Sequence, residues 1–390
     1  MKALIVGAGI AGLATGIALA LRGWKVEIFE QADALTEVGA GLQISPNGMH
    51  VLKALGVLPN LQDTVFEPEA IEMRLGVSGR RVFHLPMKGL AERRWGAPYM
   101  HVHRADLLAA LQARFDALCP GAIHLGAKIE GSAPDRGLKL NGVFHDADLC
   151  VGADGLRSTV RRHLFGASEP RYTGHLAWRA VVPLDRLSKP TPPTACVWAG
   201  DKRHAVTTRL RGGGLVNFVG IVETEEPSEE GWRIEGTRED VMRNFQGWAP
   251  EIAGILQNAS TFHRWALFDR PPLPAWSAGR TVLVGDAAHP MLPSMAQGAV
   301  QALEDAWVLA DLVSAAQPVE EALRRFYQNR IARTSRIQQG SLKNATMFHQ
   351  ASPLGRLLFY TPMAIGARLV PELIHRRQDW VYRHNVVNPS

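Results

Sequence analysis

Three glycines near the start of the chain, Gly7, Gly9 and Gly12, have the spacing G-x-G-x-x-G, which suits the binding of a pyrophosphate. The first glycine permits a tight turn, the second lets the backbone approach the phosphates, and the third lets a helix pack closely on a strand. Glu30 stands downstream, where its carboxylate can accept hydrogen bonds from a ribose hydroxyl and would repel a 2′-phosphate. These residues predict a site for an ADP-bearing dinucleotide and disfavour NADP as its occupant.

Strands and a helix must hold these residues in place, and the sequence around the glycines has the patterns of both. Residues 3–6 form a short apolar run typical of a buried parallel strand, and residues 25–29 alternate as a second strand. Between them, apolar positions at Leu13, Ile17 and Leu21 indicate a helix whose start offers free N–H groups to the phosphates. The order of strand, glycines, helix, strand and acid favours a nucleotide site over a glycine-rich helix contact without a ligand.

Two further segments place an acid after a strand-like run. Residues 147–152 lead to Asp154, and Ser158 is positioned to cap a following helix. Residues 280–284 lead to Asp286 and then to an irregular stretch. Each segment alone could be a capped strand end, but their occurrence together with the glycines favours one cofactor site. A helix after the irregular stretch is predicted by apolar positions at helical spacing: Val300, Leu303, Trp307, Ala310 and Val313.

Other motifs follow in a specific order along the chain. They are the segments at residues 39–47 (GAGLQISPN), 103–108 (HRADLL), 152–155 (GADG), 177–179 (AWR) and 285–293 (GDAAHPMLP). With the glycine fingerprint and Glu30, this set resembles the flavoprotein aromatic hydroxylases. These are the single-component FAD monooxygenases related to salicylate hydroxylase, 3-hydroxybenzoate 6-hydroxylase and 6-hydroxynicotinate 3-monooxygenase. The resemblance covers essentially the full chain.

The resemblance implies that the dinucleotide is FAD. Glu30 would hold the adenosine ribose, Arg104 would reach the pyrophosphate or ribose, and Asp286 would bind the ribityl chain. The Asp154 segment would lie near the phosphates. The helix after Gly298 would direct its N-terminus at the flavin, where free N–H groups stabilise negative charge on the ring. The implied cofactor-binding residues are Gly7, Gly9, Ala11, Gly12, Glu30, Arg104, Asp154, Gly285, Asp286, Gly298 and Ala299.

The resemblance also implies the reaction. NADH or NADPH would reduce FAD, and O2 would add beside Pro293 to form a flavin C4a-hydroperoxide. That species would hydroxylate a small hydroxylated aromatic or heteroaromatic carboxylate. Because the sequence has no second G-x-G-x-x-G, we expect the nicotinamide donor to visit transiently. The alternatives are an FAD-dependent dehydrogenase or reductase on the same fold, and a non-redox binding protein similar to the Rab escort proteins.

A phenolic or hydroxypyridine substrate is activated by losing its proton, so the site needs a base. His204 is the candidate, because an unperturbed imidazole titrates near neutral pH; the alternative is a solvated surface histidine. Relatives often carry Tyr where this chain has Thr208, and the hydroxynicotinate enzyme carries His at the Asn47 position. His289, beside a proline at a strand end, is expected to shape its loop.

The pattern as a whole predicts an α/β fold. We expect a discontinuous Rossmann-type FAD-binding domain (1–70, 100–170 and 275–345), an inserted β-sheet substrate domain (71–99 and 171–274) and a C-terminal helical segment (346–390). In the inserted sheet, four aromatic side chains could line a pocket or pack in the core: Trp178, Phe218, Trp265 and Phe268.

Charge is distributed unevenly along the 390 residues. The net charge is +6, and residues 320–390 alone hold 11 Arg or Lys against 4 acids. No aromatic platform or nucleic-acid motif accompanies this excess, so we expect no nucleic-acid partner. The spacing of Arg330, Arg333 and Arg336 predicts a solvated helix face.

Composition limits the class of protein and the compartment in which it is expected. Hydrophobic residues make up 46% and charged residues 21%, as in globular proteins. The uncharged residues 3–21 imitate a signal peptide or a membrane span, but their four glycines argue against both. Cys119, Cys150 and Cys196 show neither a disulfide framework nor metal-ligand spacing. We therefore expect a cytoplasmic monomer or homodimer without metal or membrane partner.

Overall fold

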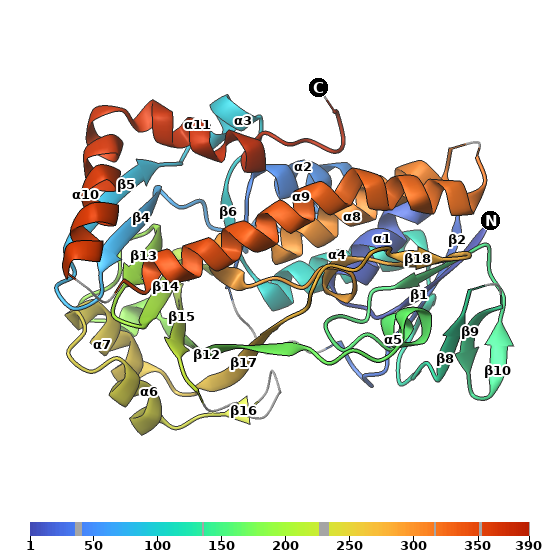
Figure 1. Ribbon diagram of the computed structural model, residues 1–390, viewed down its shortest axis with the longest axis horizontal. Coiled ribbons are helices and arrows are strands. Elements are labelled where there is room, and N and C mark those ends of the chain that lie inside the picture. The colour runs from blue at the N-terminus through green and yellow to red at the C-terminus, as the bar shows by residue number, and fades with distance from the viewer. Residues whose placement is uncertain (36–40, 135, 226–233, 316, 351–352, 390) are drawn as a thin grey trace.

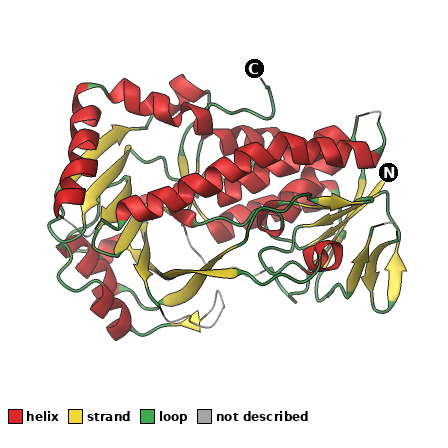
Figure 2. Ribbon diagram, viewed as in Figure 1, coloured by secondary structure: helices red, strands yellow, loops and turns green. Residues whose placement is uncertain are grey.

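The computed structural model describes residues 1–35, 41–134, 136–225, 234–315, 317–350 and 353–389. Two large sheets lie end to end along the long axis of the molecule, and helices cover them (Figures 1 and 2). Gly39 and Ala40 of the family-like motif at 39–47 lie outside the described residues.

The first sheet is parallel except at one edge strand. Its described strands, in spatial order, are β18 (Ser277–Ala278), β19 (Thr281–Leu283), β11 (Leu149–Gly152), β1 (Lys2–Val6), β2 (Lys25–Phe29) and β7 (Ile123–His124). The central strands β1 and β11 are almost entirely buried, which explains their continuous apolar runs.

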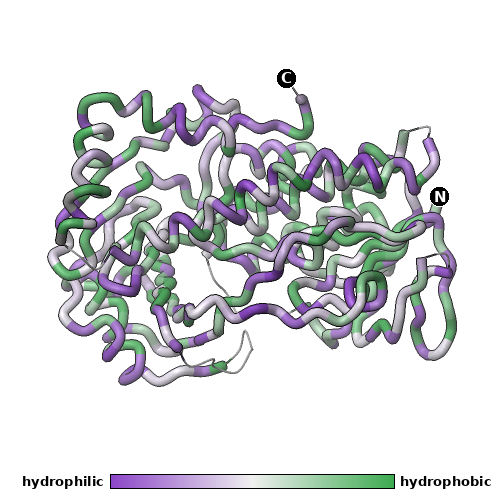
Figure 3. Tube along the Cα trace, in the orientation of Figure 1, coloured by the Kyte–Doolittle hydropathy of each residue, from purple (hydrophilic) through white to green (hydrophobic). Residues whose placement is uncertain are grey.

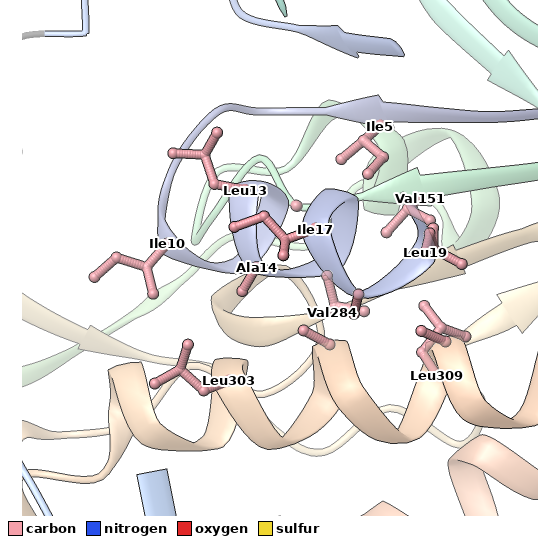
Figure 4. Packing of buried hydrophobic residues seen from close by; sticks show 14 of the residues in the cluster. Ile5, Ile10, Leu13, Ala14, Ile17, Leu19, Val151, Val284, Leu303 and Leu309 are labelled. Atoms are coloured by element: carbon pink, nitrogen blue, oxygen red, sulfur yellow. The ribbon is translucent and has the colours of Figure 1, made fainter. Parts of the chain in front are cut away.

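Helix α1 (Ile10–Ala20) packs between this sheet, α4 (Arg104–Leu118) and α8 (Gly298–Val313). Figure 4 shows Leu13 and Ile17 of α1 in one cluster with Ile5 of β1 and Leu303 of α8. Burying each such side chain contributes about 1.5–3 kcal/mol. The predicted strand–helix–strand unit is confirmed, and the long stretch of α1 without charge is a core helix.

The second sheet is antiparallel except for the β13–β4 pair. Its described strands, in spatial order, are β16 (Ile234–Glu235), β17 (His263–Asp269), β12 (Arg171–Pro183), β15 (Leu215–Glu223), β14 (Arg203–Leu210), β13 (Ala195–Ala199), β4 (Ala70–Leu75) and β5 (Arg81–Pro86). One face packs on α6 (Arg238–Asn244) and α7 (Pro250–Asn258).

The two faces of this sheet separate the four aromatic side chains offered as pocket residues. Trp178 and Phe218 are buried in the core under α6 and α7, so they pack instead of lining a pocket. Trp265 lies on the opposite face with Leu292, and Phe268 contacts the ring of Tyr172. The sheet face that carries Trp265 is thus the one turned toward the rest of the molecule.

Several smaller elements complete the fold. They are β3 (Gly41–Ile44) paired with β6 (Met100–His103), the small sheet of β8 (Gly131–Ala133), β9 (Gly137–Leu140) and β10 (Val143–His145), and the helices α2 (Pro46–Ala54), α3 (Leu90–Trp95) and α5 (Thr159–Phe165). Helix α5 begins after Ser158, whose side chain accepts a hydrogen bond from Arg161 N, as the sequence predicts.

The long helix α9 (Val319–Phe348) runs diagonally across both sheets (Figure 1). Along its tube in Figure 3, hydrophilic and hydrophobic positions alternate. Helices α10 (Pro353–Leu369) and α11 (Pro371–Tyr382) follow it, and Arg94 of α3 holds α11 through Asp379 at 2.9 Å. The predicted α/β fold with a C-terminal helical segment is confirmed.

Among the described residues, no single helix is long and apolar enough to cross a membrane. Residues 354–369 and 371–382 pass that test only as a pair, across a bend of 105°.

Candidate active site

The strand order of the first sheet brings the predicted cofactor residues to one edge. Gly7, Glu30, Asp154 and Asp286 each follow the carboxyl end of a parallel strand, β1, β2, β11 and β19. These four strands are direct neighbours. Ligands of open α/β sheets bind at this edge, where strand ends meet helix starts. The structure therefore assembles side chains that lie more than 250 residues apart in the sequence.

The three fingerprint glycines serve different purposes. Gly7 has a φ of 99°, and a Cβ there would lie 2.6 Å from the carbonyl oxygen of Ala153. A Cβ at Gly12 would overlap the carbonyl oxygen of Gly7. Among the residues that the structure describes, a Cβ at Gly9 would meet no atom within 4 Å. Gly7 and Gly12 are thus required by packing, whereas Gly9 borders open space of the kind a phosphate needs.

Glu30 fixes the shape of the glycine loop. Its Oε2 accepts a hydrogen bond from Ala8 N at 2.8 Å, and its Oε1 accepts one from Ala32 N at 2.9 Å. Each carboxylate oxygen can accept a second hydrogen bond, so the half-buried group retains acceptor capacity for a ribose hydroxyl.

Asp154 lies against the glycine loop, with its Cα 3.1 Å from where a Cβ of Gly7 would be. Its carboxylate accepts hydrogen bonds from Ser158 Oγ at 2.5 Å and from the backbone N–H groups of Thr159 and Val160. The pKa of Asp154 is raised, because the effect of burial outweighs that of these hydrogen bonds, which lower it. The side chain of Asp154, a residue that the resemblance counts as cofactor-binding, therefore caps α5, and its segment approaches the glycine loop through its backbone.

Asp286 is exposed to solvent, although protein groups lie close around its carboxylate. The residue is exposed to solvent, yet burial raises its pKa while the charges of His289 and Arg104 lower it. The two observations agree if Asp286 lies in the wall of a hollow, where water reaches it although protein lies close around it. Arg104, the first residue of α4, is near enough for its charge to act there.

Gly285 joins this segment to two helices. It has a φ of 59°, and a Cβ would lie 3.1 Å from the Cβ of Ala11 on α1 and 3.3 Å from that of Ala302 on α8. The small residue at position 11 is therefore explained by the close approach of Gly285.

The start of α8 is open on the side of the irregular segment. Within the described part of the chain, a Cβ at Gly298 would meet only Met291 Cγ, at 3.9 Å. No side chain of the described residues caps the helix, and Ala299 is half-buried. Pro293, which lies five residues before the first residue of α8, is exposed. Helix N–H groups without intrahelical partners carry partial positive charge, so this end of α8 can stabilise an anion beside Pro293.

A buried charge network beneath α8 was missed by sequence reasoning. Arg330 of α9 is 1% exposed, and it pairs with Glu304 at 2.6 Å and with Asp305 at 2.8 Å. Arg333 binds Glu304 at 2.8 Å, while Arg336 stacks over Trp380. The predicted solvated face of α9 is therefore wrong at Arg330 and Arg333. The available signal was the pair Glu304–Asp305 inside an otherwise apolar helical pattern.

This network also explains Asn47 and His289. Asn47 is buried and donates to Glu304 Oε1 at 2.7 Å and to Gln297 Oε1 at 3.1 Å, so it links α2 to the start of α8. His289 Nε2 lies 2.6 Å from Asp305 Oδ2. Its expected role in shaping the loop agrees with this contact.

His204 lies in β14 and is completely buried, so the alternative of a solvated surface histidine is wrong. Its Nδ1 lies 2.6 Å from Nε2 of His349, the residue that directly follows α9, and its Nε2 has no hydrogen-bond partner among the described residues. Burial, with His349 and His175 adding to it, lowers its pKa well below the usual range. Its cross-strand partner Ile221 packs with Leu292, which precedes Pro293.

Thr208 faces the same side of β14 as His204. Asn217 Nδ2 donates to Thr208 Oγ1 at 3.2 Å, and Asn217 Oδ1 accepts from Gly41 N at 3.0 Å. The Thr208 end of β14 thus touches β3, and the His204 end touches α9.

The fold and this strand edge define a dinucleotide-binding α/β protein with an anion-stabilising helix start beside its ligand edge. Comparisons with known proteins identify the dinucleotide. The family model described as "FAD binding domain" matches residues 1–340. The 3-amino-4-hydroxybenzoate 2-monooxygenase of Streptomyces platensis is 37% identical over 352 residues, which cover 88% of each chain. The 3-hydroxybenzoate 6-hydroxylase of Polaromonas naphthalenivorans (strain CJ2) is 33% identical, over 100% of this chain and 97% of its own.

Solved structures agree in fold. Klebsiella pneumoniae HpxO, crystallised with FAD and uric acid, aligns with a TM-score of 0.83 at 24% identity, over 96% of both chains. The chain therefore belongs to the single-component FAD-dependent aromatic hydroxylase family. It is an FAD-dependent aromatic monooxygenase, and neither the dehydrogenase nor the escort-protein alternative is favoured. The open space at Gly9 and Gly298 and the accessible Asp286 fit FAD as the cofactor.

Proposed function

We propose that this monooxygenase uses NADH or NADPH and O2 to hydroxylate a small phenolic carboxylate of the hydroxybenzoate type. Two relatives that cover most of the chain act, by their names, on 3-amino-4-hydroxybenzoate and 3-hydroxybenzoate. A hydroxypyridine carboxylate is the second candidate, because the 6-hydroxynicotinate 3-monooxygenase of Bordetella bronchiseptica is 32% identical over 93% of this chain.

One observation carries the proposal: the buried imidazole of His204 lies on the sheet face whose hydrophobic cluster includes Leu292, the residue before Pro293. Ile221 pairs with His204 across the sheet and packs on Leu292, the residue before Pro293. A ring held between this sheet face and Pro293 would have its hydroxyl within reach of an imidazole nitrogen. Removing the phenolic proton makes the ring electron-rich, which is the state that accepts a hydroxyl group.

The residues of the first sheet would hold the cofactor. Gly7, Gly9, Gly12, Glu30 and Arg104 would bind the adenosine and pyrophosphate half. Asp286 would bind the ribityl chain, and Gly298 and Ala299 would present helix N–H groups to the ring. FAD, when bound, supplies the oxygen activation that side chains cannot provide. Pro293 and the sheet face would exclude water around the ring.

The sheets support a functional division of the chain. Residues 1–70, 100–170 and 275–345 would form the FAD-binding domain, and residues 71–99 and 171–274 would form the substrate domain. The helical segment 346–390 would close the substrate side. The proposal includes a cytoplasmic location. It also includes a monomeric or homodimeric state, and light scattering of the purified protein can measure that state.

Turnover of a substrate panel tests the proposal. Oxidation of NADH and of NADPH is followed with hydroxybenzoates, aminohydroxybenzoates and hydroxypyridine carboxylates, and products are identified by mass. We expect a hydroxylated product from at least one phenolic carboxylate, with O2 and nicotinamide consumed in equal amounts. Nicotinamide oxidation that yields only hydrogen peroxide with every compound would contradict the substrate class.

A further inference from the structure

A chain of three side chains runs from the interior of the second sheet to its surface. His204 Nδ1 lies 2.6 Å from His349 Nε2, and His349 Nδ1 lies 2.7 Å from Glu223 Oε1. The side chain of His204 is completely buried, that of His349 is 2% exposed, and that of Glu223 is 40% exposed. The contacts therefore form a continuous hydrogen-bonded path from a buried imidazole to solvent.

The carboxylate at the outer end determines where the protons lie. An ionised carboxylate only accepts hydrogen bonds, so His349 Nδ1 must donate to Glu223. In a neutral imidazole the other nitrogen then carries a lone pair, so His349 Nε2 accepts and His204 Nδ1 donates. By the same rule His204 Nε2 is unprotonated. This nitrogen is buried without a partner among the described residues, so it is available to accept a hydrogen bond from a water or a ligand group.

The helix that carries His349 is fixed to the segment around Pro293. Gln338 of α9 donates to the carbonyl of Pro290 at 2.8 Å, and Asn344 donates to the carbonyl of Ser294 at 3.2 Å. Phe348 contacts the edge of the His204 ring, with centroids 5.2 Å apart. The position of His349 is thus set by the same helix that supports the loop of the active site.

We propose that His349 and Glu223 form a proton exit for the active site, carrying the phenolic proton of the substrate from His204 to solvent. The inference rests on the proposed function, because it assigns His204 Nε2 to the substrate hydroxyl. The substrate O–H bond breaks and a bond to His204 Nε2 forms. The Nδ1 proton of His204 passes to His349 Nε2, and the Nδ1 proton of His349 passes to Glu223, which releases it to water. One proton leaves and no electrons move. When the hydroxylated ring takes up a proton before release, the path runs inward and restores both tautomers.

Other charged groups face this path from several elements. His175 of β12 lies with its ring centroid 5.4 Å from that of His349, and Arg203 of β14 lies near enough to act on its charge. Burial lowers the pKa of His349, Glu223 raises it, and His175 and Arg203 lower it. A path of mainly neutral imidazoles moves protons without holding a positive charge, as transient transfer requires.

A divalent cation is the rival occupant of this cluster. His175, Glu223 and His349 offer ligand atoms within 4.8 Å of one another. Two contacts favour the proton path: His349 Nδ1 already lies at hydrogen-bond distance from Glu223, and His175 Nδ1 lies 2.9 Å from the carbonyl of Thr173. A cation on His349 Nδ1 would also block the exit.

The test measures proton release when wild type and variants bind a hydroxybenzoate that the wild type hydroxylates. Stopped-flow mixing in weak buffer with a pH indicator gives the rate, and ligand titration gives the Kd. In H349Q we expect release and hydroxylation to slow by about tenfold or more with Kd within about twofold, because Gln hydrogen-bonds but does not relay a proton. Added imidazole should restore part of the rate. E223Q should slow release by about threefold, since water can replace an exposed carboxylate.

His84 supplies the matched control. It lies in β5 of the same sheet and contacts Glu72 at 2.8 Å, away from the proposed path. H84Q should release protons at the wild-type rate. FAD content and thermal unfolding of each variant show whether it folds, and E223Q, altered at an exposed group, keeps the test open if H349Q does not fold.

Each outcome has one meaning. Wild-type proton release in both H349Q and E223Q, with hydroxylation intact, would overturn the exit and leave the proposed function standing. Failure of the wild type to hydroxylate any phenolic carboxylate would overturn the proposed function and the exit with it. If a chelator abolished wild-type activity and Zn²⁺ restored it, the cluster would be a metal site and the exit would be wrong.

Discussion

Asp305 of α8 holds both ends of the Gly285–His289 segment with a single carboxylate oxygen. Its Oδ2 accepts a hydrogen bond from Gly285 N at 2.9 Å and lies 2.6 Å from His289 Nε2. Its other oxygen pairs with Arg330. Asp286 lies between the two held residues, so the position of this proposed FAD ligand depends on the buried pair of Asp305 and Arg330.

Replacing Arg330 tests the strength of this support. R330M removes the buried arginine that pairs with both Glu304 and Asp305, which should lower the free energy of unfolding by about 3–5 kcal/mol. Urea unfolding measures the loss. The control is R324M, whose arginine forms an exposed pair with Glu321 and should change stability by less than about 0.5 kcal/mol. Equal losses in the two variants would show that the buried pairs contribute no special stability.

The same network predicts how stability responds to acid. Burial raises the pKa values of Glu304 and Asp305, but the ion pairs, with Arg330 foremost for Glu304 and His289 for Asp305, outweigh it and lower both from their usual 4.5 and 3.8. A carboxyl with a lowered folded pKa stabilises the protein above its unfolded pKa and loses this contribution as pH falls through the folded value. The stability gap between wild type and R330M should therefore shrink below about pH 4.5. Unfolding curves between pH 7 and pH 3 measure the gap, and a constant gap would contradict the assignment.

Gly9 and Gly12 should respond to alanine in opposite ways. The Cβ of G9A enters open space, and the backbone there (φ −76°, ψ −173°) suits any residue, so the apoprotein should unfold like wild type. The methyl group would occupy the phosphate position, and FAD affinity should fall by about tenfold or more. G12A overlaps the Gly7 carbonyl and should lose about 1–3 kcal/mol of stability. Apoprotein unfolding and FAD titration separate the two effects; full FAD affinity in G9A would place the pyrophosphate elsewhere.

Asp286 should matter for FAD retention. D286A removes a hydrogen-bond acceptor for the ribityl chain, and a hydrogen bond to a charged group contributes about 1.5–3 kcal/mol, or roughly tenfold to a hundredfold in Kd. FAD fluorescence on binding measures the change. D311A, at an exposed residue in the last turn of α8, should bind FAD as wild type does. An unchanged Kd in D286A would remove this residue from the site.

His204 should act on one half-reaction. H204A should slow hydroxylation by about a hundredfold, the usual contribution of a general base, and slow flavin reduction less. Anaerobic reduction and single-turnover oxidation, each followed by flavin absorbance, separate the steps. Equal slowing of both would exclude His204 as the base.

The sequence predicted what local pattern determines. The β1–α1–β2 unit, the cap at Ser158 and the start of α8 at Gly298 follow from strand runs, glycines and helical spacing within about 20 residues. The common edge for Glu30 and Asp286 also follows, because parallel strands align their carboxyl ends.

Contacts between residues on different elements could not be predicted from the spacing of residues along one element. Arg330 looked solvated because its partners lie on another helix, and charge spacing along α9 alone cannot show that they are buried. Asp154 has the residue type of a cofactor ligand, but its carboxylate turns to α5. His349 carries no motif, and its importance comes from meeting His204 across the fold.

The number of residues between Arg330 and His349 is fixed by two contacts, one at each of these residues. Arg330 of α9 must enter the charge network under α8, and His349, which directly follows the helix, must reach His204. One added residue between them would turn His349 by about 100° around the helix axis and move it by about 1.5 Å. Homologous enzymes that keep both contacts should therefore tolerate substitutions along this stretch and exclude insertions and deletions.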